Sequence, residues 1–175
     1  MNRWLWYVWI YSFLGYGIEK VFAAITKAEH QVRKCFLLLP FCPVYGLGMA
    51  AVLALPDAIL RSWWLILFGG ATATAVEYAM HWGYERFLGV CFWDYSHVRG
   101  NLRGRICLPF AAAWGILCAA AVWFVHPVVK DAAAAVPAEV TYLCWMLFVA
   151  DGVASAFFLQ NTGNIDGLRL WQGGK

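Results

Sequence analysis

The chain has 175 residues, of which 63% are hydrophobic and only 13% are charged, and its formal net charge is +3. A soluble domain carries about 25% charged residues, and a chain of this length has too much surface to hide so many apolar side chains from water. The composition therefore excludes a soluble globular enzyme, a disordered protein and a disulfide-stapled secreted domain, and it predicts an integral membrane protein. The modest net charge indicates no nucleic-acid partner.

Five segments are apolar and long enough to cross a bilayer, since about 20 helical residues span a hydrocarbon core of about 30 Å. We expect an all-α bundle of five transmembrane helices, which forms a single integral membrane domain over residues 1–175. The spans cover about 4–25, 40–60, 63–84, 106–126 and 139–160, and 161–175 form a polar cytoplasmic tail. Pro40 and Pro43 predict an irregular start to the second span, with regular helix from about Val44.

Lysine and arginine are unevenly distributed between the two sides of such a bundle. One side carries Lys27, Arg33, Lys34, Arg86, Arg99, Arg103, Arg105, Arg169 and Lys175. The other side carries Arg3, Arg61 and Lys130. Because cytoplasmic loops are enriched in these residues, we expect a multi-pass protein of the cell membrane with its N-terminus outside and its C-terminus in the cytoplasm. Tryptophans near the span ends, such as Trp63, Trp64 and Trp82, are typical of an interfacial aromatic belt.

Three carboxylates, Glu19, Glu77 and Asp151, lie inside predicted spans, where an ionisable group is costly unless it has a partner or a purpose. All three are on odd-numbered spans and at similar positions along them. We therefore expect them at one depth, in the cytoplasmic half of the bilayer, around a common polar cavity. The alternative is structural, because the small and polar residues that share a helix face with each acid are also typical of helix packing in lipid.

The connector before the fourth span contains several residues with turn-forming or ionic chemistry. Asp94 and Ser96 predict a local turn, and Gly100 and Gly104 permit tight backbone paths. Arg105 lies where the fourth span begins, and we expect it to pair with Glu19, Glu77 or Asp94. The candidate residues of the polar cavity are Glu19, Tyr45, Glu77, Asp94, Tyr95, Asn101, Arg105, Trp114 and Asp151.

We expect neither a metal nor a cofactor. Glu77 and His81 are four residues apart and face the same way, so with Glu19 they are the residues that would begin a metal site. A histidine near the end of a span is more typically an interfacial hydrogen-bonding group. The six cysteines include no C-x-x-C pair, which indicates reduced, structural thiols and no zinc site.

Several motifs, in this order along the chain, together resemble the CmpB-type family of ABC-transporter permeases. They are Gly15-Tyr16 with Glu19, Phe41-Cys42-Pro43-Val44-Tyr45-Gly46-Leu47-Gly48, Glu77, Trp93-Asp94-Tyr95-Ser96, Asn101 with Gly104-Arg105-Ile106-Cys107-Leu108, and Trp114-Gly115. The resemblance covers about Tyr11 to Pro127 and departs from the family at Lys34 and Leu39, where glycine is expected. It implies a transport role. The chain has no G-x-x-x-x-G-K-[ST] motif, so a transport component would need a separate ATPase subunit, and we expect so small a bundle to form a homodimer.

The sequence leaves three functions open. The first is a transport component with a polar cavity, as the resemblance implies. The second is a membrane-embedded enzyme or small-ligand-binding protein that uses the same carboxylates as acids or bases. The third is a structural or accessory membrane protein whose polar cluster fixes helix register. Membrane lipids are partners under all three.

Overall fold

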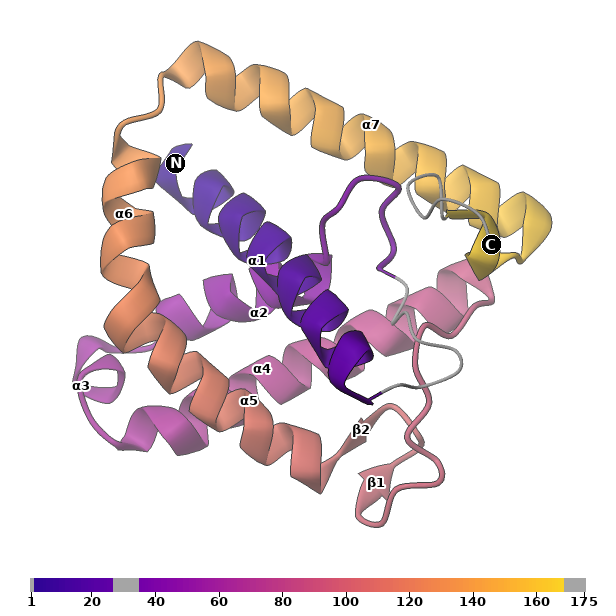
Figure 1. Ribbon diagram of the computed structural model, residues 1–175, viewed down its shortest axis with the longest axis horizontal. Coiled ribbons are helices and arrows are strands. Elements are labelled where there is room, and N and C mark those ends of the chain that lie inside the picture. The colour runs from indigo at the N-terminus through magenta and orange to yellow at the C-terminus, as the bar shows by residue number, and fades with distance from the viewer. Residues whose placement is uncertain (1, 27–34, 169–175) are drawn as a thin grey trace.

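The computed structural model describes residues 2–26 and 35–168, and these residues are mostly helical (Figure 1). The elements in chain order are α1 (Asn2–Thr26), α2 (Pro43–Leu53), α3 (Asp57–Leu60), α4 (Trp64–Gly83), a π-helical turn η1 (Tyr84–Leu88), β1 (Asn101–Leu102), β2 (Ile106–Cys107), α5 (Leu108–Ala120), a second π-helical turn η2 (Ala121–Val125), α6 (His126–Ala134), α7 (Ala138–Thr162) and a 3₁₀ turn η3 (Ile165–Leu168).

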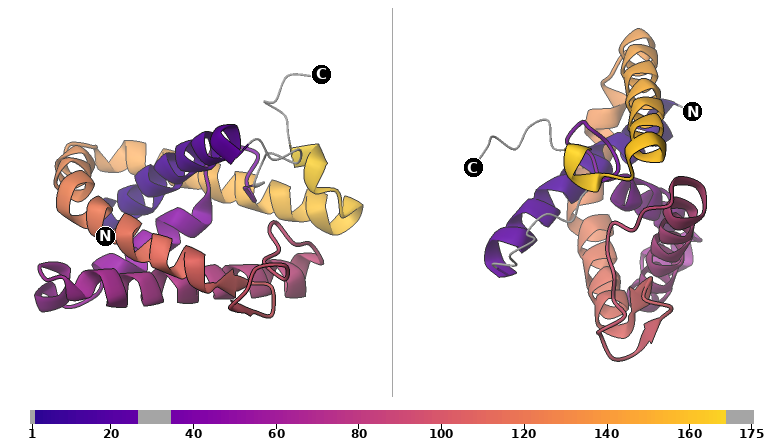
Figure 2. Two further views of the ribbon diagram at one scale, coloured as in Figure 1. Left: turned by 60° about the horizontal axis from the view of Figure 1, so that its bottom comes forward. Right: turned by 90° about the vertical axis from the view of Figure 1, so that its right-hand side faces the viewer.

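Two antiparallel helices, α4 and α5, lie side by side along the length of the molecule, and α1 crosses near them (Figure 2). Small residues allow this close approach. A Cβ added to Gly70 would lie 2.9 Å from the Gly115 Cα, and one added to Gly115 would meet the Ile66 carbonyl oxygen. In lipid, where helices gain no solvent-driven attraction for one another, such contact surfaces of small residues are a main source of helix association.

Three helical segments are long and apolar enough to cross a membrane: Asn2–Thr26, Leu108–Ala134 and Ala138–Thr162. They correspond to the predicted spans 4–25, 106–126 and 139–160, although the second continues eight residues beyond its predicted end. The π-helical turn η2 ends at Val125, two residues before Pro127, and such a turn accommodates the ring and the missing N–H without ending the helix. A helix also occupies most of the predicted span 63–84, as the 20-residue α4, but it lies outside this set of three.

The predicted second span, 40–60, is not one helix. Helix α2 has 11 residues and ends at Leu53, so its length of about 16 Å is half the hydrocarbon thickness. Pro56 and the short α3 follow it. The irregular start is confirmed, because the helix begins at Pro43 after an extended Cys42. The Cys42 N–H donates to the Ser12 carbonyl at 2.9 Å, which satisfies one backbone group of this non-helical stretch.

The described residues are mostly helical, as expected, and the small exception is an antiparallel hairpin of two two-residue strands. In it Asn101 pairs with Cys107 and Leu102 with Ile106. The three connecting residues include Arg103 at φ 55° and Gly104 at φ 69°, both in the left-handed region. Glycine adopts this conformation at little cost, which is why the tight backbone path predicted at Gly104 closes a hairpin.

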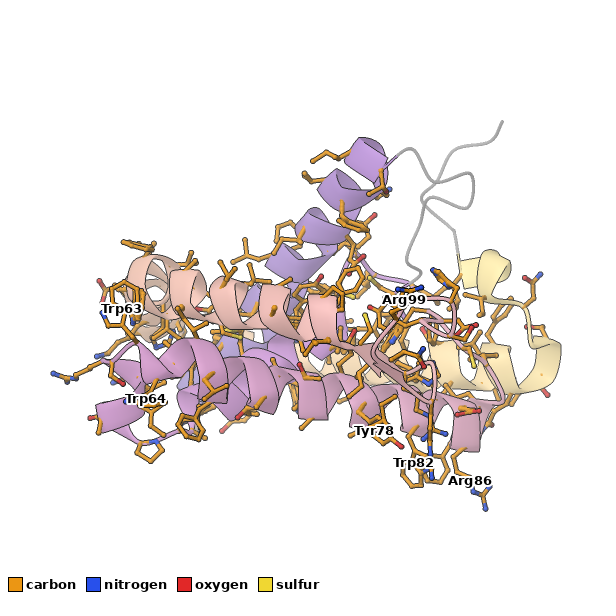
Figure 3. The ribbon with its side chains drawn as sticks, turned by 90° about the horizontal axis from the view of Figure 1, so that it is seen from below. Trp63, Trp64, Tyr78, Trp82, Arg86 and Arg99 are labelled. Atoms are coloured by element: carbon orange, nitrogen blue, oxygen red, sulfur yellow. The ribbon has the colours of Figure 1, made fainter. Side chains whose placement is uncertain are left out.

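The exposed tryptophans of α4 mark its two ends. Figure 3 shows Trp63 and Trp64 at one end and Trp82 with Arg86 at the other. Trp63 is 77% exposed and Trp82 46%. From Trp64 to Trp82 the helix rises about 27 Å, close to the hydrocarbon thickness, as expected for rings that lie at the two interfaces of a membrane.

Candidate functional site

Two of the three predicted intramembrane acids lie in the main core, where α1, α2, α4 and α5 meet. Glu19 of α1 is 6% exposed and Glu77 of α4 is 2% exposed. On α1, Ser12 and Gly15, which share the face of Glu19, are buried as well, and Tyr16 on the same face is partly buried. The helix periodicity that placed these residues on one face is therefore confirmed.

Aromatic side chains from three further segments hold these carboxylates. The Tyr45 hydroxyl donates to Glu19 Oε1 at 2.7 Å. The Trp114 Nε1 donates to Glu77 Oε2 at 2.9 Å, and the Tyr95 hydroxyl donates to Glu77 Oε1 at 3.0 Å. The rings of Tyr45 and Trp114 are themselves in contact, with centroids 4.8 Å apart. These five predicted residues thus form one continuous group, the acid–aromatic cluster.

Glycines bring the helices of this cluster together. A Cβ on Gly15 of α1 would collide with the Tyr45 ring, and one on Gly46 of α2 would collide with the Val8 carbonyl oxygen on α1. Both glycines belong to motifs seen in the sequence. Their physical role is to let α1 and α2 approach until the Tyr45 hydroxyl reaches Glu19.

The turn at residues 93–96 positions Tyr95. Asp94 accepts hydrogen bonds from the Ser96 N–H at 2.8 Å and from the Ser96 hydroxyl at 2.9 Å, which confirms the predicted local turn. These two bonds hold the pKa of the Asp94 carboxyl below its usual range, because they favour the ionised form. The Tyr95 N–H donates to the Gly104 carbonyl at 2.7 Å, and the Asn101 side chain accepts from the Gly104 N–H at 3.0 Å. Asp94 and Asn101 therefore support the cluster from the loop and do not line it.

Arg105 pairs with a residue that the sequence analysis missed. Its Nη2 and Nε lie 2.6 and 3.1 Å from Glu85 Oε2, and its Nη1 donates to the Tyr78 hydroxyl at 2.9 Å. The pKa of Arg105 is raised, chiefly by the hydrogen bond to Glu85. The predicted pairing with Glu19, Glu77 or Asp94 is wrong. Tyr78 and Glu85 are seven residues apart, two helical turns, and that spacing was the available signal.

Asp151 does not join the cluster. Its Oδ1 accepts from the Leu38 N–H at 3.2 Å and its Oδ2 from the Leu39 N–H at 3.1 Å, while Ser155 contacts both Asp151 and Leu38. The prediction that all three acids line a common cavity is therefore wrong. The side chain of Asp151 instead binds the backbone of the irregular stretch before α2, whose N–H groups have no helical partner.

His81 of α4 is buried beside Trp93, with 5% of its surface exposed. Its Nε2 donates to the Trp93 carbonyl at 2.9 Å, since a carbonyl can only accept, and its Nδ1 has no hydrogen-bond partner among the described residues. Within residues 2–26 and 35–168 no three histidine, cysteine or acidic side chains are grouped as a metal site would need. None of the six cysteines, all of which lie in the described ranges, forms a disulfide.

A groove of about 430 Å³ opens beside the cluster, between α1 and α5. Glu19, Tyr45 and Trp114 form its inner wall, and Phe22 and Phe110 lie on its flanks. Ile116, which also lines it, is 66% exposed, so the groove opens on the outer surface of the bundle. The sequence analysis missed Phe22 and Phe110, because an aromatic residue inside an apolar run carries no pattern of its own.

Some sequence-based expectations fall outside the residues that the structure describes. They concern Lys27, Arg33 and Lys34 in the first connector, and Arg169 and Lys175 in the tail. The departure from the family pattern at Lys34 is among them, and the cytoplasmic tail expected at 161–175 is described only as far as Leu168.

Comparison with known proteins gives one family. The sequence model of that family, CmpB-type ABC transporters, is described as "Putative ABC-transporter type IV" and matches residues 6–156. The match extends beyond the motif-bearing stretch at both ends and includes most of α7. No curated protein and no solved structure matches the chain. Because this match covers most of the chain, it shows that the chain belongs to the CmpB-type ABC-transporter family.

Proposed function

We propose that this protein is the membrane-embedded component of a transport system and that the acid–aromatic cluster recognises an amphipathic molecule in the adjoining groove. The observation that supports this most is the position of Glu19. It is a buried carboxylate in a contact surface between helices, and it also forms part of the wall of an open, largely apolar groove. Ionisable groups inside spans are costly and characteristically mark substrate pathways.

The chemistry of the groove defines the class of ligand. Its flanks, which include Phe22, Phe110 and Ile116, suit an apolar body that enters from the lipid. Glu19 and Tyr45 at the inner wall suit a single hydrogen-bonding group, which in a low-dielectric site interacts more strongly than in water. A long-chain amine is the simplest probe with both properties.

The first experiment uses a photoreactive dodecylamine, added to the purified protein in a neutral detergent. We expect labelling of peptides that contain Phe22 or Phe110, and about a tenfold loss of labelling in Glu19→Gln, since a lost charge-assisted hydrogen bond costs about 1.5 kcal/mol. Glu139→Gln, which changes an exposed acid at the start of α7, is the matched control. Equal labelling of the two variants would contradict the proposal.

The thermal unfolding of Glu19→Gln and Glu77→Gln separates this function from an architectural one. A glutamine oxygen still accepts the Tyr45 or Trp114 hydrogen bond, so we expect a small change in unfolding temperature alongside the loss of labelling. A large fall in unfolding temperature with unchanged labelling would make the cluster architectural.

Transport by an ABC-type mechanism also requires an ATPase subunit and favours a homodimer. Purification from native membranes in a mild detergent, followed by mass measurement of the intact complex, tests both. We expect two copies of this chain with a nucleotide-binding chain. If the nucleotide-binding chain is absent from complexes purified in several mild detergents, the result would favour a ligand-binding protein that does not transport its ligand.

We also propose an orientation, with the N-terminus outside and the C-terminus in the cytoplasm. Arg86, Arg99 and Arg103 are exposed in or near the loop between α4 and α5, and cytoplasmic loops are enriched in such residues. Cys91 in the same loop is the one cysteine classed as exposed among the six. We expect a membrane-impermeant maleimide to label it in intact cells only after permeabilisation. Labelling without permeabilisation would reverse the orientation.

A further inference from the structure

A second, larger cleft lies at the end of the molecule where α1 begins, far from the β1–β2 hairpin (Figure 1). Its volume is about 1160 Å³, and its walls come from α1, α2, α3, η2 and α6. None of its lining residues belongs to the acid–aromatic cluster, so the proposed function leaves it unassigned.

Three cations from separate segments line this cleft: Arg3 of α1, Arg61 directly after α3, and Lys130 of α6. Within the part of the chain that the structure describes, none of the three has a carboxylate within salt-bridge distance. Arg105 at the other end differs, because Glu85 neutralises it. Asp57 is the single acid among the lining residues, so the charged side chains of the cleft sum to a positive value.

Fixed contacts hold the walls in place. The Trp123 Nε1 donates to the Leu60 carbonyl at 3.0 Å, which joins η2 to α3. His126 packs edge-on against the Tyr7 ring, with centroids 4.9 Å apart, and its Nδ1 lies 3.3 Å from the Tyr11 hydroxyl, which joins α6 to α1. The first turn of α1 carries no acidic residue, so nothing there offsets the positive end of the helix dipole.

We infer that this cleft binds a phosphate-bearing anion. Arginine forks match phosphate oxygens in geometry, and lysine adds a point charge. The cleft is much larger than a free phosphate, and its wall includes the amphipathic rings of Trp4 and Trp123. The ligand is therefore a phosphate joined to a larger body, which is either the headgroup of an anionic phospholipid or a soluble phosphorylated molecule.

The test measures the affinity of a fluorescent short-chain phosphatidylglycerol for the full chain in neutral detergent, by fluorescence anisotropy. The triple variant Arg3→Gln, Arg61→Gln, Lys130→Gln should weaken binding about tenfold, which corresponds to about 1.4 kcal/mol, because each exposed charge makes only a modest contribution. The matched control, Arg86→Gln, Arg99→Gln, Arg103→Gln, removes the same charge at the other end and should change the affinity less than about twofold. Asp57→Asn should tighten binding about twofold, since it removes a repulsive charge, and this gain cannot come from misfolding.

Competition distinguishes the two sources of the phosphate. Displacement by unlabelled phosphatidylglycerol and not by glycerol 3-phosphate assigns a lipid headgroup, and displacement by both assigns a soluble phosphorylated ligand. Equal losses in the two triple variants would show charge attraction without a site and would overturn the inference. Displacement of the probe by phosphatidylcholine as effectively as by phosphatidylglycerol would overturn it as well.

Discussion

The protein has two kinds of buried carboxylate, and their partners distinguish them. Asp151 binds the backbone N–H groups of Leu38 and Leu39, which have no helical partner. Glu19 and Glu77 accept hydrogen bonds from the side chains of Tyr45, Tyr95 and Trp114, and Glu19 lines a groove.

This difference separates a role in the fold from a role at a site. A carboxylate that satisfies backbone donors cannot leave them without exposing unpaired N–H groups at membrane depth. One held by aromatic hydroxyl and indole groups beside an opening can exchange partners with a bound molecule at much lower cost. Burial alone, which is similar for the three acids, does not distinguish them.

The largest effect on stability is expected for Asp151→Ala. The change leaves the partly buried Leu39 N–H without an acceptor and the Leu38 N–H with the Ser155 hydroxyl alone, and it should lower the free energy of unfolding by about 3 kcal/mol. Unfolding followed by circular dichroism in detergent measures it. Asp151→Asn keeps one acceptor oxygen and should lose less. The structural role would be contradicted if Asp151→Ala unfolded like the wild-type protein.

The next effect concerns the contact between α1 and α2. Gly46→Ala places a methyl group against the Val8 carbonyl and should cost about 2 kcal/mol, because the two backbones must separate. The same separation weakens the bond between Tyr45 and Glu19, so labelling by the photoreactive amine should fall. Gly17→Ala is the control, since a Cβ there meets nothing within 4 Å. Equal effects of the two variants would show that close approach is not the cause.

A smaller effect is expected for Tyr95→Phe, which removes one donor to Glu77 and retains the ring. The free energy of unfolding should fall by about 1 kcal/mol, since Trp114 still binds the carboxylate. Thermal unfolding of this variant beside the exposed control Tyr142→Phe measures the difference. A loss equal to that of Asp151→Ala would remove the distinction between the two kinds of acid.

The smallest effect concerns Cys91, which lies in the loop between η1 and β1, outside the helices. Partial burial raises the pKa of its thiol, and Glu85 and Asp94 raise it further, so its thiolate fraction near neutral pH is low. Alkylation should therefore still accelerate as the pH passes the ordinary value of 9.0. Glu85→Gln should lower the pKa and speed alkylation at pH 8 about twofold. An unchanged rate would contradict the influence of Glu85.

Local patterns in the sequence predicted part of this arrangement correctly. Helical periodicity identified the buried faces around Glu19 and Glu77, and the spacing of Asp94 and Ser96 predicted their turn. Family motifs brought Tyr45, Tyr95 and Trp114 into the candidate set. Each of these signals depends on neighbours within one segment or on a known motif.

The errors arose where segments meet in space. Equal depth on parallel spans suggested that Asp151 joins the other acids, but depth does not fix which way a helix faces. Arg105 was expected to pair with Glu19, Glu77 or Asp94, because no local pattern indicates that Glu85, in η1, lies beside it. The length of α2 was overestimated, since apolar composition continues through Pro56 although the helix does not.

Helix α7 buries four residues, of which Thr141, Asp151 and Ser155 are polar, while Leu143, Met146, Leu147 and Val153 face outward. Its attachment to the bundle therefore depends more on a few hydrogen bonds than on extensive apolar packing. The outward-facing positions can exchange one aliphatic residue for another during evolution, whereas the three inner polar positions tolerate little change. Members of the family should accordingly vary along this helix with a helical period.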